Sequence, residues 1–347
     1  MNLKQAKTAL APMTNLQSQK SGELGDDEYN WLVSRAKAGF DVVISCASHV
    51  SKSGQGWLGE LACYEDRFVP GLKKLAKGLH QYDCLGIVQI FHAGYFADQE
   101  LVRPRLSASE VRLVDHIPAA KAMSEAEIEL VIDDFVKAAQ RIEKAGWDGV
   151  EIHAANGYLF SQFLGKRSNT RTDKWGGSLE NRYRLLNETI KRVKANTIDN
   201  FIVGVRLSPQ DSESRPVGIE FNETLELITK LEDLNVSYIH LSAWDVFKKD
   251  NDGECIVSKV KKAIENKTPL MAAGEIWTQA QAQKAHELGI DIVAIGKAAI
   301  TTPDWPIRVY KNGDNPEFTP VTEAHLKSAH LGPDFIKYMS RWPGFLK

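Results

Sequence analysis

Cysteine is scarce in this chain, and the four that it has lie far apart, at Cys46, Cys63, Cys84 and Cys255. No two of them form a C-x-x-C pair, the spacing found in many zinc and iron–sulfur sites. The wide spacing also argues against a disulfide framework. We therefore predict reduced, mostly buried thiols and no metal site.

Long apolar runs and basic blocks are absent too. The sequence has no run of eighteen apolar residues, and its first thirteen residues, MNLKQAKTALAPM, lack the apolar stretch of a secretory signal. Its 43 basic and 45 acidic residues give a formal charge of −2 and form no cluster that could follow a phosphate backbone. These absences predict a cytoplasmic protein that binds neither membrane nor nucleic acid.

A glycine-rich dinucleotide loop is also missing, since no G-x-G-x-x-G follows the first strand-like segment. Instead, strand-like and helix-like segments alternate, which predicts parallel strands joined by helices. Eight strands are expected, at Thr8–Pro12, Asp41–Cys46, Gly86–Phe91, Gly149–His153, Ile202–Leu207, Tyr238–Ser242, Leu270–Ala273 and Asp291–Gly296. This pattern favours a closed (β/α)8 barrel, the TIM barrel of the α/β class, and an open doubly wound sheet is the alternative.

The clearest helix is expected from Ser124 to Ala145, where apolar residues recur at i, i+3, i+4 and i+7. Ser124 and Glu127 have the spacing of a capping box, and Gly146 marks the end of the helix. Further helices are expected at Asp27–Ala38, Arg67–Tyr82, Leu179–Asn196, Asn222–Leu234, Ile256–Asn266 and Thr278–Leu288.

Two segments depart from this alternation. The stretch between Phe91 and Ser124 is too long for an ordinary strand-to-helix connection, so we interpret it as a loop excursion over the C-terminal face of the barrel. The tail from Thr302 is too rich in aromatic residues for a disordered end and should pack on its own barrel or on a neighbouring subunit. The sequence shows no domain boundary. We therefore expect one domain over residues 1–347, with the barrel at about 8–305 and a C-terminal extension at about 306–347.

Polar side chains leave the fourth expected strand together. His153, Asn156 and Tyr158 follow a short apolar run, and loops after parallel strands share one face of a barrel. They are therefore candidate catalytic or binding groups. Structural interpretations stand beside this one, because Asn156 begins a common turn dipeptide and Tyr158 could pack against Phe160 or Phe163.

Glycines follow the last two expected strands, at Gly274 and at Gly296, which precedes Lys297. A glycine at a strand-to-helix turn exposes backbone N–H groups to a phosphate, the helix N-terminus adds a favourable dipole, and a lysine adds a counter-charge. Because barrels recurrently bind phosphate at this place, a phosphorylated cofactor or substrate is expected. The alternatives are simple tight turns, or a phosphosugar-type lyase or aldolase in which Lys297 forms a Schiff base.

Several motifs resemble, in the same order, those of the old yellow enzyme family of FMN-dependent ene-reductases and NADH:flavin oxidoreductases. They are APMT at 11–14, GIVQIFHAG at 86–94, the H-x-x-N-x-Y of 153–158, SNTRTDKWGGSLENRYR at 168–184, VGVRLS at 203–208, MAAGEI at 271–276 and AIGKAAITTPDW at 294–305. The resemblance implies an FMN site formed by Pro12, Met13, Thr14, Ala47, Gln89, Arg206, Gly274, Gly296 and Lys297.

The residue types suit a flavin. A fixed guanidinium such as that of Arg206 would stabilise the negative charge of the reduced ring, while Thr14 and Gln89 can hydrogen-bond its other edge. Without the resemblance, an ion pair of Arg206 with a nearby acid is the structural alternative.

The resemblance also implies catalytic roles. His153 and Asn156 can hold a carbonyl oxygen while it gains negative charge, and Tyr158 is placed to protonate the substrate carbon. Some positions depart from the family pattern: Lys297 replaces the commoner arginine, Thr14 replaces the cysteine of one branch, and no arginine follows the HAG motif. In some relatives a C-terminal arginine reaches into a neighbour's site, a role open to Arg341.

Together these features predict an oxidoreductase in which NADH or NADPH reduces FMN, and the flavin passes hydride to a small electron-poor acceptor such as an enone, an enal or a quinone. A non-catalytic flavin-binding barrel is the other interpretation, and a homo-oligomer is compatible with either.

Overall fold

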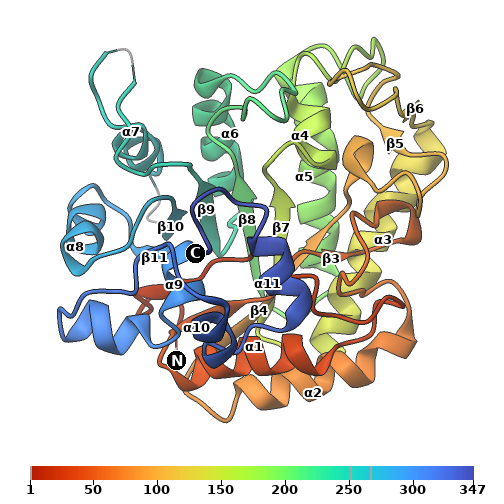
Figure 1. Ribbon diagram of the computed structural model, residues 1–347. Helices are drawn as coiled ribbons and strands as arrows, with labels where there is room; N and C mark the ends of the chain where they lie inside the picture. Colours follow the sequence, from red (N-terminus) through yellow and green to blue (C-terminus); the bar gives the residue numbers. More distant parts are fainter. Residues whose placement is uncertain (1, 251, 266–267) are drawn as a thin grey trace.

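The computed structural model describes residues 2–250, 252–265 and 268–347, and a closed ring of parallel strands lies at its centre (Figure 1). The eight strands are, around the ring, β1 (Thr8–Leu10), β2 (Val42–Ile44), β4 (Leu85–Phe91), β7 (Gly149–Ala154), β8 (Ile202–Leu207), β9 (Tyr238–Ser242), β10 (Leu270–Ala273) and β11 (Ile292–Ile295). The ring closes because β1 pairs with both β2 and β11, so that Leu10 lies beside Val43 and Ile295. The predicted TIM barrel is confirmed, with every expected strand in place.

Helices cover the outside of the barrel. They are α1 (Asp26–Lys37), α2 (Val69–Leu79), α3 (Glu125–Lys144), α4 (Leu159–Leu164), α5 (Leu179–Ala195), α6 (Phe221–Asp233), α7 (Ile256–Ala263), α8 (Gln279–Glu287) and α9 (Lys297–Thr301). Barrel strands are therefore covered on both sides, and all seven residues of β4 are buried. The expected helix end at Asn266 lies outside the described residues, and α7 ends at Ala263.

Helix α3 forms where its apolar periodicity predicts. The Ser124 hydroxyl accepts a hydrogen bond from the backbone N–H of Glu127, and the Glu127 carboxylate accepts one from the N–H of Ser124. This capping box satisfies two N–H groups that the helix itself leaves unpaired. The face that carries Ile128, Ile132 and Phe135 is fully buried against the barrel.

The segment between β4 and α3 lies at the rim of the barrel, beside α4 (Figure 1). It contains two short paired strands, β5 (Leu106–Ser107) and β6 (Lys121–Ala122), and turns of 3₁₀ helix occur at Gly94–Phe96 and elsewhere at Lys52–Gly54 and Asp66–Phe68. A short strand β3 (Ser48–His49) adds to β4. Phe96 and Leu101 of the segment pack in the cluster that also contains Tyr158.

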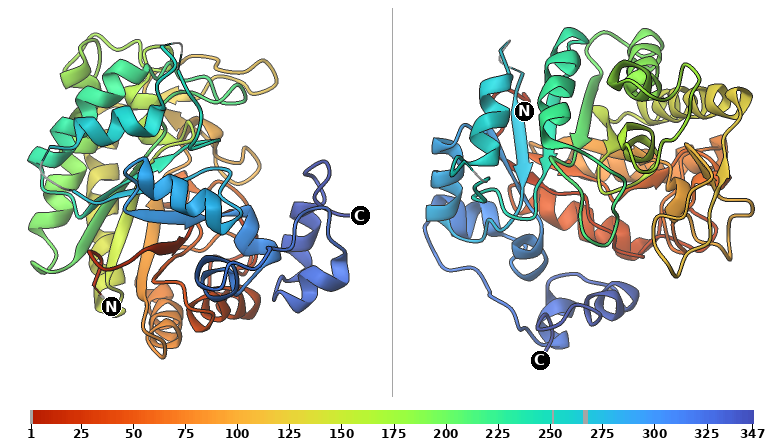
Figure 2. Two further views of the ribbon diagram at one scale, coloured as in Figure 1. Left: turned by 90° about the vertical axis from the view of Figure 1, so that its left-hand side faces the viewer. Right: turned by 90° about the horizontal axis from the view of Figure 1, so that it is seen from above.

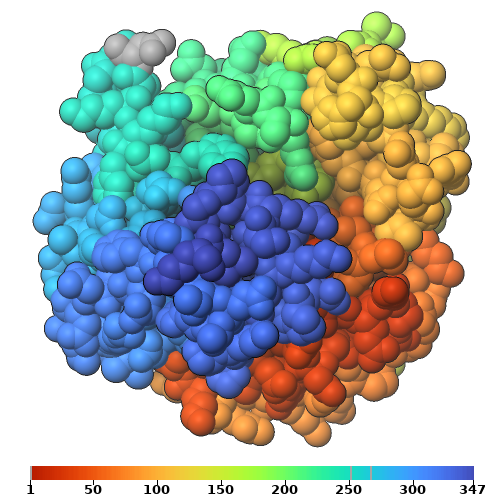
Figure 3. All heavy atoms as spheres, viewed as in Figure 1, coloured from red at the N-terminus to blue at the C-terminus, as the bar shows by residue number. Residues whose placement is uncertain are grey.

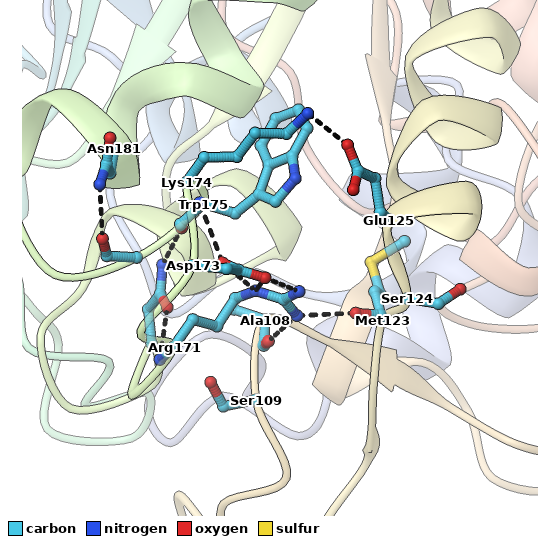
Figure 4. Close-up of polar contacts among 12 residues, drawn as sticks. Ala108, Ser109, Met123, Ser124, Glu125, Arg171, Asp173, Lys174, Trp175 and Asn181 are labelled. Carbon is cyan, nitrogen blue, oxygen red and sulfur yellow. Dashed lines mark hydrogen bonds and ion pairs between the residues drawn. The ribbon is translucent and has the colours of Figure 1, made fainter.

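The charged loop at 168–177 anchors this segment. Arg171 forms an ion pair with Asp173 and donates hydrogen bonds to the carbonyl oxygens of Ala108 and Met123, at 3.0 and 2.6 Å (Figure 4). The Asn169 amide donates to two further carbonyl oxygens, those of Phe163 and Trp175. Loops of this length often carry function, and the contacts of this one connect the rim segment to the barrel.

The C-terminal tail packs on its own barrel, which decides between the two expectations. After a π-helical turn at Pro306–Lys311 it forms α10 (Glu323–Ser328) and α11 (Pro333–Met339). Figures 2 and 3 show it outside the ring of helices, on one face of the molecule. Phe335 is fully buried edge-on against Trp31 of α1, with ring centroids 5.1 Å apart.

The structure also shows the state of the cysteines and the character of the helices. All four cysteines are free thiols, and three of them, Cys46, Cys63 and Cys84, are buried, while Cys255 is half-buried. Over the described ranges, no helix is both long enough and apolar enough to cross a lipid bilayer.

Candidate active site

A cavity of about 460 Å³ opens at the carboxyl ends of the barrel strands. This volume lies in the range of about 300–1,000 Å³ that is usual for cofactor and ligand sites. The lining brings together all twelve residues predicted to be catalytic or cofactor-binding: Pro12, Met13, Thr14, Ala47, Gln89, His153, Asn156, Tyr158, Arg206, Gly274, Gly296 and Lys297. Residues of the tail close one side, among them Phe335, Tyr338 and Trp342.

His153, at the end of β7, has a hydrogen-bonding pattern that assigns its tautomer. Its Nδ1 atom accepts a hydrogen bond from the backbone N–H of Ala155 at 3.3 Å, so the proton of the neutral ring resides on Nε2. Burial lowers the pKa of His153 well below its usual value, and the cations Arg206 and Arg215 lower it further. The imidazole is therefore a neutral hydrogen-bond donor at Nε2.

Asn156 is held in a left-handed conformation, with φ of 58°, just past the strand. Its Oδ1 atom accepts hydrogen bonds from the hydroxyls of Ser208 and Ser242, at 3.4 and 3.3 Å. This assigns the amide orientation and leaves the Nδ2 hydrogens available to the cavity. Two neutral donors, from His153 and Asn156, thus line one cavity.

Tyr158 packs on residues other than the two that the sequence suggested. Its ring lies edge-on to those of Phe91 and His153, each with centroids 5.1 Å apart, and the Arg215 guanidinium carbon lies 4.4 Å from its centroid. The residue is 7% exposed and lines the cavity. Among the described ring contacts, Tyr158 thus packs on Phe91 and His153 and not on Phe160 or Phe163, the two residues considered from the sequence.

Arg206, at the end of β8, is 8% exposed and carries an unsatisfied donor. Its Nη1 donates to the carbonyl oxygen of Pro12 at 3.3 Å and its Nη2 to the hydroxyl of Ser242 at 3.0 Å, whereas the buried Nε has no partner among the described residues. A buried donor without a partner costs about 1–3 kcal/mol, so the site calls for a bound acceptor. The polar edge of FMN fits this need.

The acid that acts electrostatically on Arg206 is Glu151, and the structure as described shows no ion pair between them. Glu151, fully buried inside the barrel, accepts hydrogen bonds from Gln89 at 2.7 Å and Tyr238 at 2.9 Å, and pairs with His240 at 2.8 Å. Burial alone would raise the pKa of Glu151, but His240 and Arg206 hold it below its ordinary value. The direct ion pair considered for Arg206 is thus not formed, although the Glu151 carboxylate balances its charge from within the barrel.

The predicted phosphate end of the site differs from expectation in two ways. Lys297 already forms an ion pair with Glu275 at 2.8 Å, a carboxylate on the same cavity that the sequence analysis did not single out. Helix α9 is only five residues long, so the expected contribution of a helix dipole is small. The two glycines are unlike each other: a Cβ at Gly274 would lie 2.5 Å from the Ala243 carbonyl oxygen, whereas one at Gly296 would meet nothing nearer than Met13 Sδ at 3.7 Å.

We expect Gly296→Ala to weaken FMN binding without destabilising the apoprotein. The added methyl group fits the protein but takes space on the cofactor side, and overpacking of this kind costs about 1–3 kcal/mol. Fluorescence titration of the apoprotein with FMN measures the affinity, and a thermal melt of the apoprotein is the control. Unchanged FMN affinity would show that Gly296 does not border the cofactor. Gly274→Ala, in contrast, should lower the melting temperature of the apoprotein itself.

His92 follows β4 but is not one of the described residues that line the cavity. Its Nδ1 accepts a hydrogen bond from the Gly94 N–H at 3.0 Å, and its Nε2 lies 3.2 Å from the Ser53 hydroxyl. Burial, with a smaller contribution from His49, lowers the pKa of His92 to about 3. The residue is therefore a neutral structural histidine.

This histidine should make folding stability depend on pH. Because its folded pKa of about 3 lies below the ordinary 6.5, the unfolded chain binds the extra proton between these values. The contribution is complete above pH 6.5 and is lost as the pH falls, by up to about 1.4 kcal/mol per pH unit. The variant His92→Asn keeps an acceptor for the Gly94 N–H but cannot take up this proton. Between pH 4 and 6, its free energy of unfolding in urea should therefore change less with pH than that of the wild type, by the equivalent of about one bound proton. An unchanged slope would mean that folded His92 titrates normally.

Other residues that line the cavity were not predicted, among them Arg215, Glu275 and Tyr338. Arg215 lies on the loop after β8, where no motif marks it, and only its place beyond a strand end could have indicated it. Glu275 directly follows Gly274 and could have been found in the same way. Tyr338 comes from the tail, and its hydroxyl interacts with Thr14; burial raises its pKa.

The chain is similar to known proteins over nearly its whole length. A probable NADH-dependent flavin oxidoreductase of Bacillus subtilis is 33% identical over 334 residues, which are 94% of this chain and 89% of that protein. An NADH:acrylate oxidoreductase of Vibrio harveyi is 31% identical over 91% of this chain, but the chain spans only 33% of its length. Among solved structures, the old yellow enzyme homologue of Zymomonas mobilis has a TM-score of 0.82, 26% identity, and 92% coverage of both chains.

The model of one protein family, described as the NADH:flavin oxidoreductase / NADH oxidase family, matches residues 1–315. This match confirms the predicted family, the FMN cofactor, and the use of NADH or NADPH as reductant. It excludes the phosphosugar lyase or aldolase that Lys297 left open. By the extent of this match and the likeness of its barrel to old yellow enzyme homologues, the chain belongs to the NADH:flavin oxidoreductase / NADH oxidase family.

Proposed function

We propose that this oxidoreductase reduces a carbon–carbon double bond conjugated to a carbonyl group, in a small molecule such as an enone or an enal. The observation that carries this proposal is a pair of donors, His153 Nε2–H and Asn156 Nδ2–H, which have no partner among the described residues and share one cavity with the Tyr158 ring. The relative from Vibrio harveyi, which is named for acrylate, is consistent with a conjugated substrate.

The cofactor would be held by the residues implied by the resemblance. Arg206 would place its unpartnered Nε–H on the polar edge of the ring, and Gly296 and Lys297 would hold the phosphate. Lys297 must exchange its contact with Glu275 for a contact with the phosphate, which is an inexpensive change because this ion pair is 44% exposed on both sides. When bound and reduced, FMN supplies the hydride.

The two donors would act on the carbonyl oxygen of the acceptor. As hydride adds to the β-carbon, the π electrons of the double bond move toward this oxygen, and its negative charge grows. His153 and Asn156 are held in place by Ala155 and by two serines, so they need no rearrangement to stabilise that charge. A preorganised donor of this kind contributes about 10²–10³ in rate.

Tyr158 would complete the reaction by giving its phenolic proton to the α-carbon. Its ring is fixed between Phe91, His153 and the Arg215 guanidinium, so the hydroxyl has a restricted position on the cavity. A proton and a hydride together saturate the double bond, and water then restores the proton to Tyr158. The neutral His153 cannot replace it, because giving up the Nε2 proton would create an imidazolate.

The test is anaerobic mixing of the NADH-reduced holoenzyme with cyclohex-2-enone in D₂O. We expect rapid reoxidation of the flavin and cyclohexanone that carries one deuterium at the α-carbon. Saturated cyclohexanone serves as the control and should leave the flavin reduced. Reoxidation by benzoquinone but not by the enone would contradict alkene reduction and favour a quinone as the acceptor.

A further inference from the structure

Arg215 is a cation on the acceptor side of the cavity whose purpose the flavin site does not explain. It lines the cavity together with Asn156 and Tyr158. Its guanidinium carbon lies 4.4 Å from the ring centroid of Tyr158 and 4.9 Å from that of Phe96, and Nη1 donates to the carbonyl oxygen of Asn156 at 3.1 Å. The cation therefore lies beside both a proposed donor and the proposed acid.

The neighbouring chain is shaped around this side chain. Gly157 has φ of 76°, and a Cβ on it would lie 2.8 Å from Cβ of Arg215 and 3.4 Å from its Cδ. The stem of Arg215 thus occupies the space that a larger residue at position 157 would need. Two aromatic faces and one carbonyl oxygen then hold the head, which makes this a preorganised position rather than a freely moving surface arginine.

The charge of Arg215 is not balanced locally. Within the described ranges the guanidinium forms no ion pair with an acid, and its one hydrogen bond uses a single N–H of five. Arg206 is a second cation on the same cavity, more deeply buried than the half-buried Arg215, and both guanidiniums act on His153. The hydroxyl-bearing residues Ser212 and Ser214 line the cavity next to Arg215. This end of the cavity therefore suits an anion with several acceptor oxygens.

We propose that the acceptor carries a carboxylate in addition to its conjugated carbonyl, and that Arg215 binds this carboxylate while His153 and Asn156 hold the carbonyl oxygen. The inference rests on the proposed function and makes it narrower, since the substrate class becomes unsaturated oxo acids and half-esters of unsaturated diacids. A planar guanidinium suits the two oxygens of a carboxylate.

A phosphate of NADH is the other anion that could reach this cation. The place of Arg215 favours the acceptor, because the guanidinium lies on Tyr158 and on the Asn156 backbone, the groups that would surround the reacting double bond. The experiment separates these two sources by measuring acceptor binding and flavin reduction by NADH independently.

The test uses pairs of phenols that differ only in charge. Phenols with a carboxylate, 3- and 4-hydroxybenzoate, are titrated into the oxidised holoenzyme at pH 7 beside their neutral methyl esters, and long-wavelength absorbance gives each Kd. Arg215→Gln should weaken binding of the better hydroxybenzoate by about 10- to 100-fold, the range expected for a charge-assisted contact. Binding of its ester should change by no more than roughly twofold.

Two further variants complete the design. Arg215→Lys keeps the charge without the planar fork and should fall between the wild type and Arg215→Gln. Lys248 is an exposed cation that lines a small hollow next to the cavity and is not among the described residues that line the cavity itself. The Lys248→Gln variant should therefore bind the hydroxybenzoates as tightly as the wild type does. If Lys248→Gln weakened hydroxybenzoate binding as much as Arg215→Gln does, a general effect of positive charge would explain the binding, and the proposed contact with Arg215 would be wrong.

The remaining outcomes each have one meaning. Equal weakening of acid and ester by Arg215→Gln would show a merely structural arginine and overturn the proposal. Slower flavin reduction by NADH with unchanged acid binding would assign Arg215 to the reductant's phosphate and also overturn it. If no phenol, charged or neutral, gave a long-wavelength band with the wild type, the proposed function itself would fail, and the anion site with it.

Discussion

Tyr158→Phe should lower turnover with cyclohex-2-enone by about 10²–10³-fold, while the rate at which NADH reduces the flavin stays nearly unchanged. The substitution removes the proposed proton donor alone, because the ring keeps its contacts with Phe91, His153 and the Arg215 guanidinium. Stopped-flow absorbance of the flavin measures the two half-reactions separately.

The matched control is Tyr95→Phe. Tyr95 is a fully buried tyrosine whose hydroxyl donates to the Ile117 carbonyl oxygen at 2.6 Å, and it is not among the described residues that line the cavity. This control should cost stability, with little change in oxidation of the reduced flavin by the enone. Wild-type turnover by Tyr158→Phe would remove Tyr158 from the proton transfer and leave the proton to water.

Asn156→Asp should weaken phenol binding and enone turnover by about 10²–10³-fold each, the cost of one lost oxyanion donor. Aspartate has the shape of asparagine, and one of its oxygens can still accept the hydrogen bonds of Ser208 and Ser242. Its second oxygen replaces the Nδ2 donor and would face the negative charge of a phenolate or of the developing enolate. The same backbone thus changes from attracting that charge to repelling it.

Asn156→Ala separates the two effects, because it removes the donor without adding a charge. Its phenol Kd should lie between those of the wild type and Asn156→Asp, and the flavin spectrum of both variants should show full cofactor loading. If Asn156→Asp bound phenols as tightly as the wild type, the amide would point away from the ligand, and the orientation assigned from the two serines would be wrong.

The barrel could be predicted because its strands are buried on both faces. Segments such as Val42–Ile44 and Leu270–Ala273 therefore appear as short apolar runs between turn residues, and the polar residues that follow them necessarily share one face. All twelve candidate residues meet on one cavity for this reason. The roles assigned to them stay predictions.

The features of the site that could not be predicted depend on the three-dimensional contacts of each residue. Whether His153 presents Nε2–H is decided by the backbone N–H of Ala155, and the orientation of the Asn156 amide by Ser242, a residue 86 positions away. The ion pair of Lys297 with Glu275 joins the ends of two neighbouring strands in the same way. No local pattern records such pairings.

Loops and tails were the least predictable parts. Arg215 lies in a segment without periodicity or a motif, and the aromatic tail fitted either its own barrel or a second subunit until Phe335 was found against Trp31. This intramolecular packing supports our proposal that residues 1–347 form a single domain. The hydrogen bonds by which Arg171 connects the rim segment to the barrel likewise join residues far apart in the sequence.

The central claim is that the cavity binds FMN and that His153 and Asn156 hold an anionic oxygen beside it. Its most direct test is the visible absorption spectrum of the purified protein, recorded before and after addition of a simple phenol. We predict the absorption bands of a bound flavin and a new long-wavelength charge-transfer band that saturates with phenol. A protein that stays colourless after incubation with FMN, or a flavin spectrum that phenol does not alter, would contradict the account.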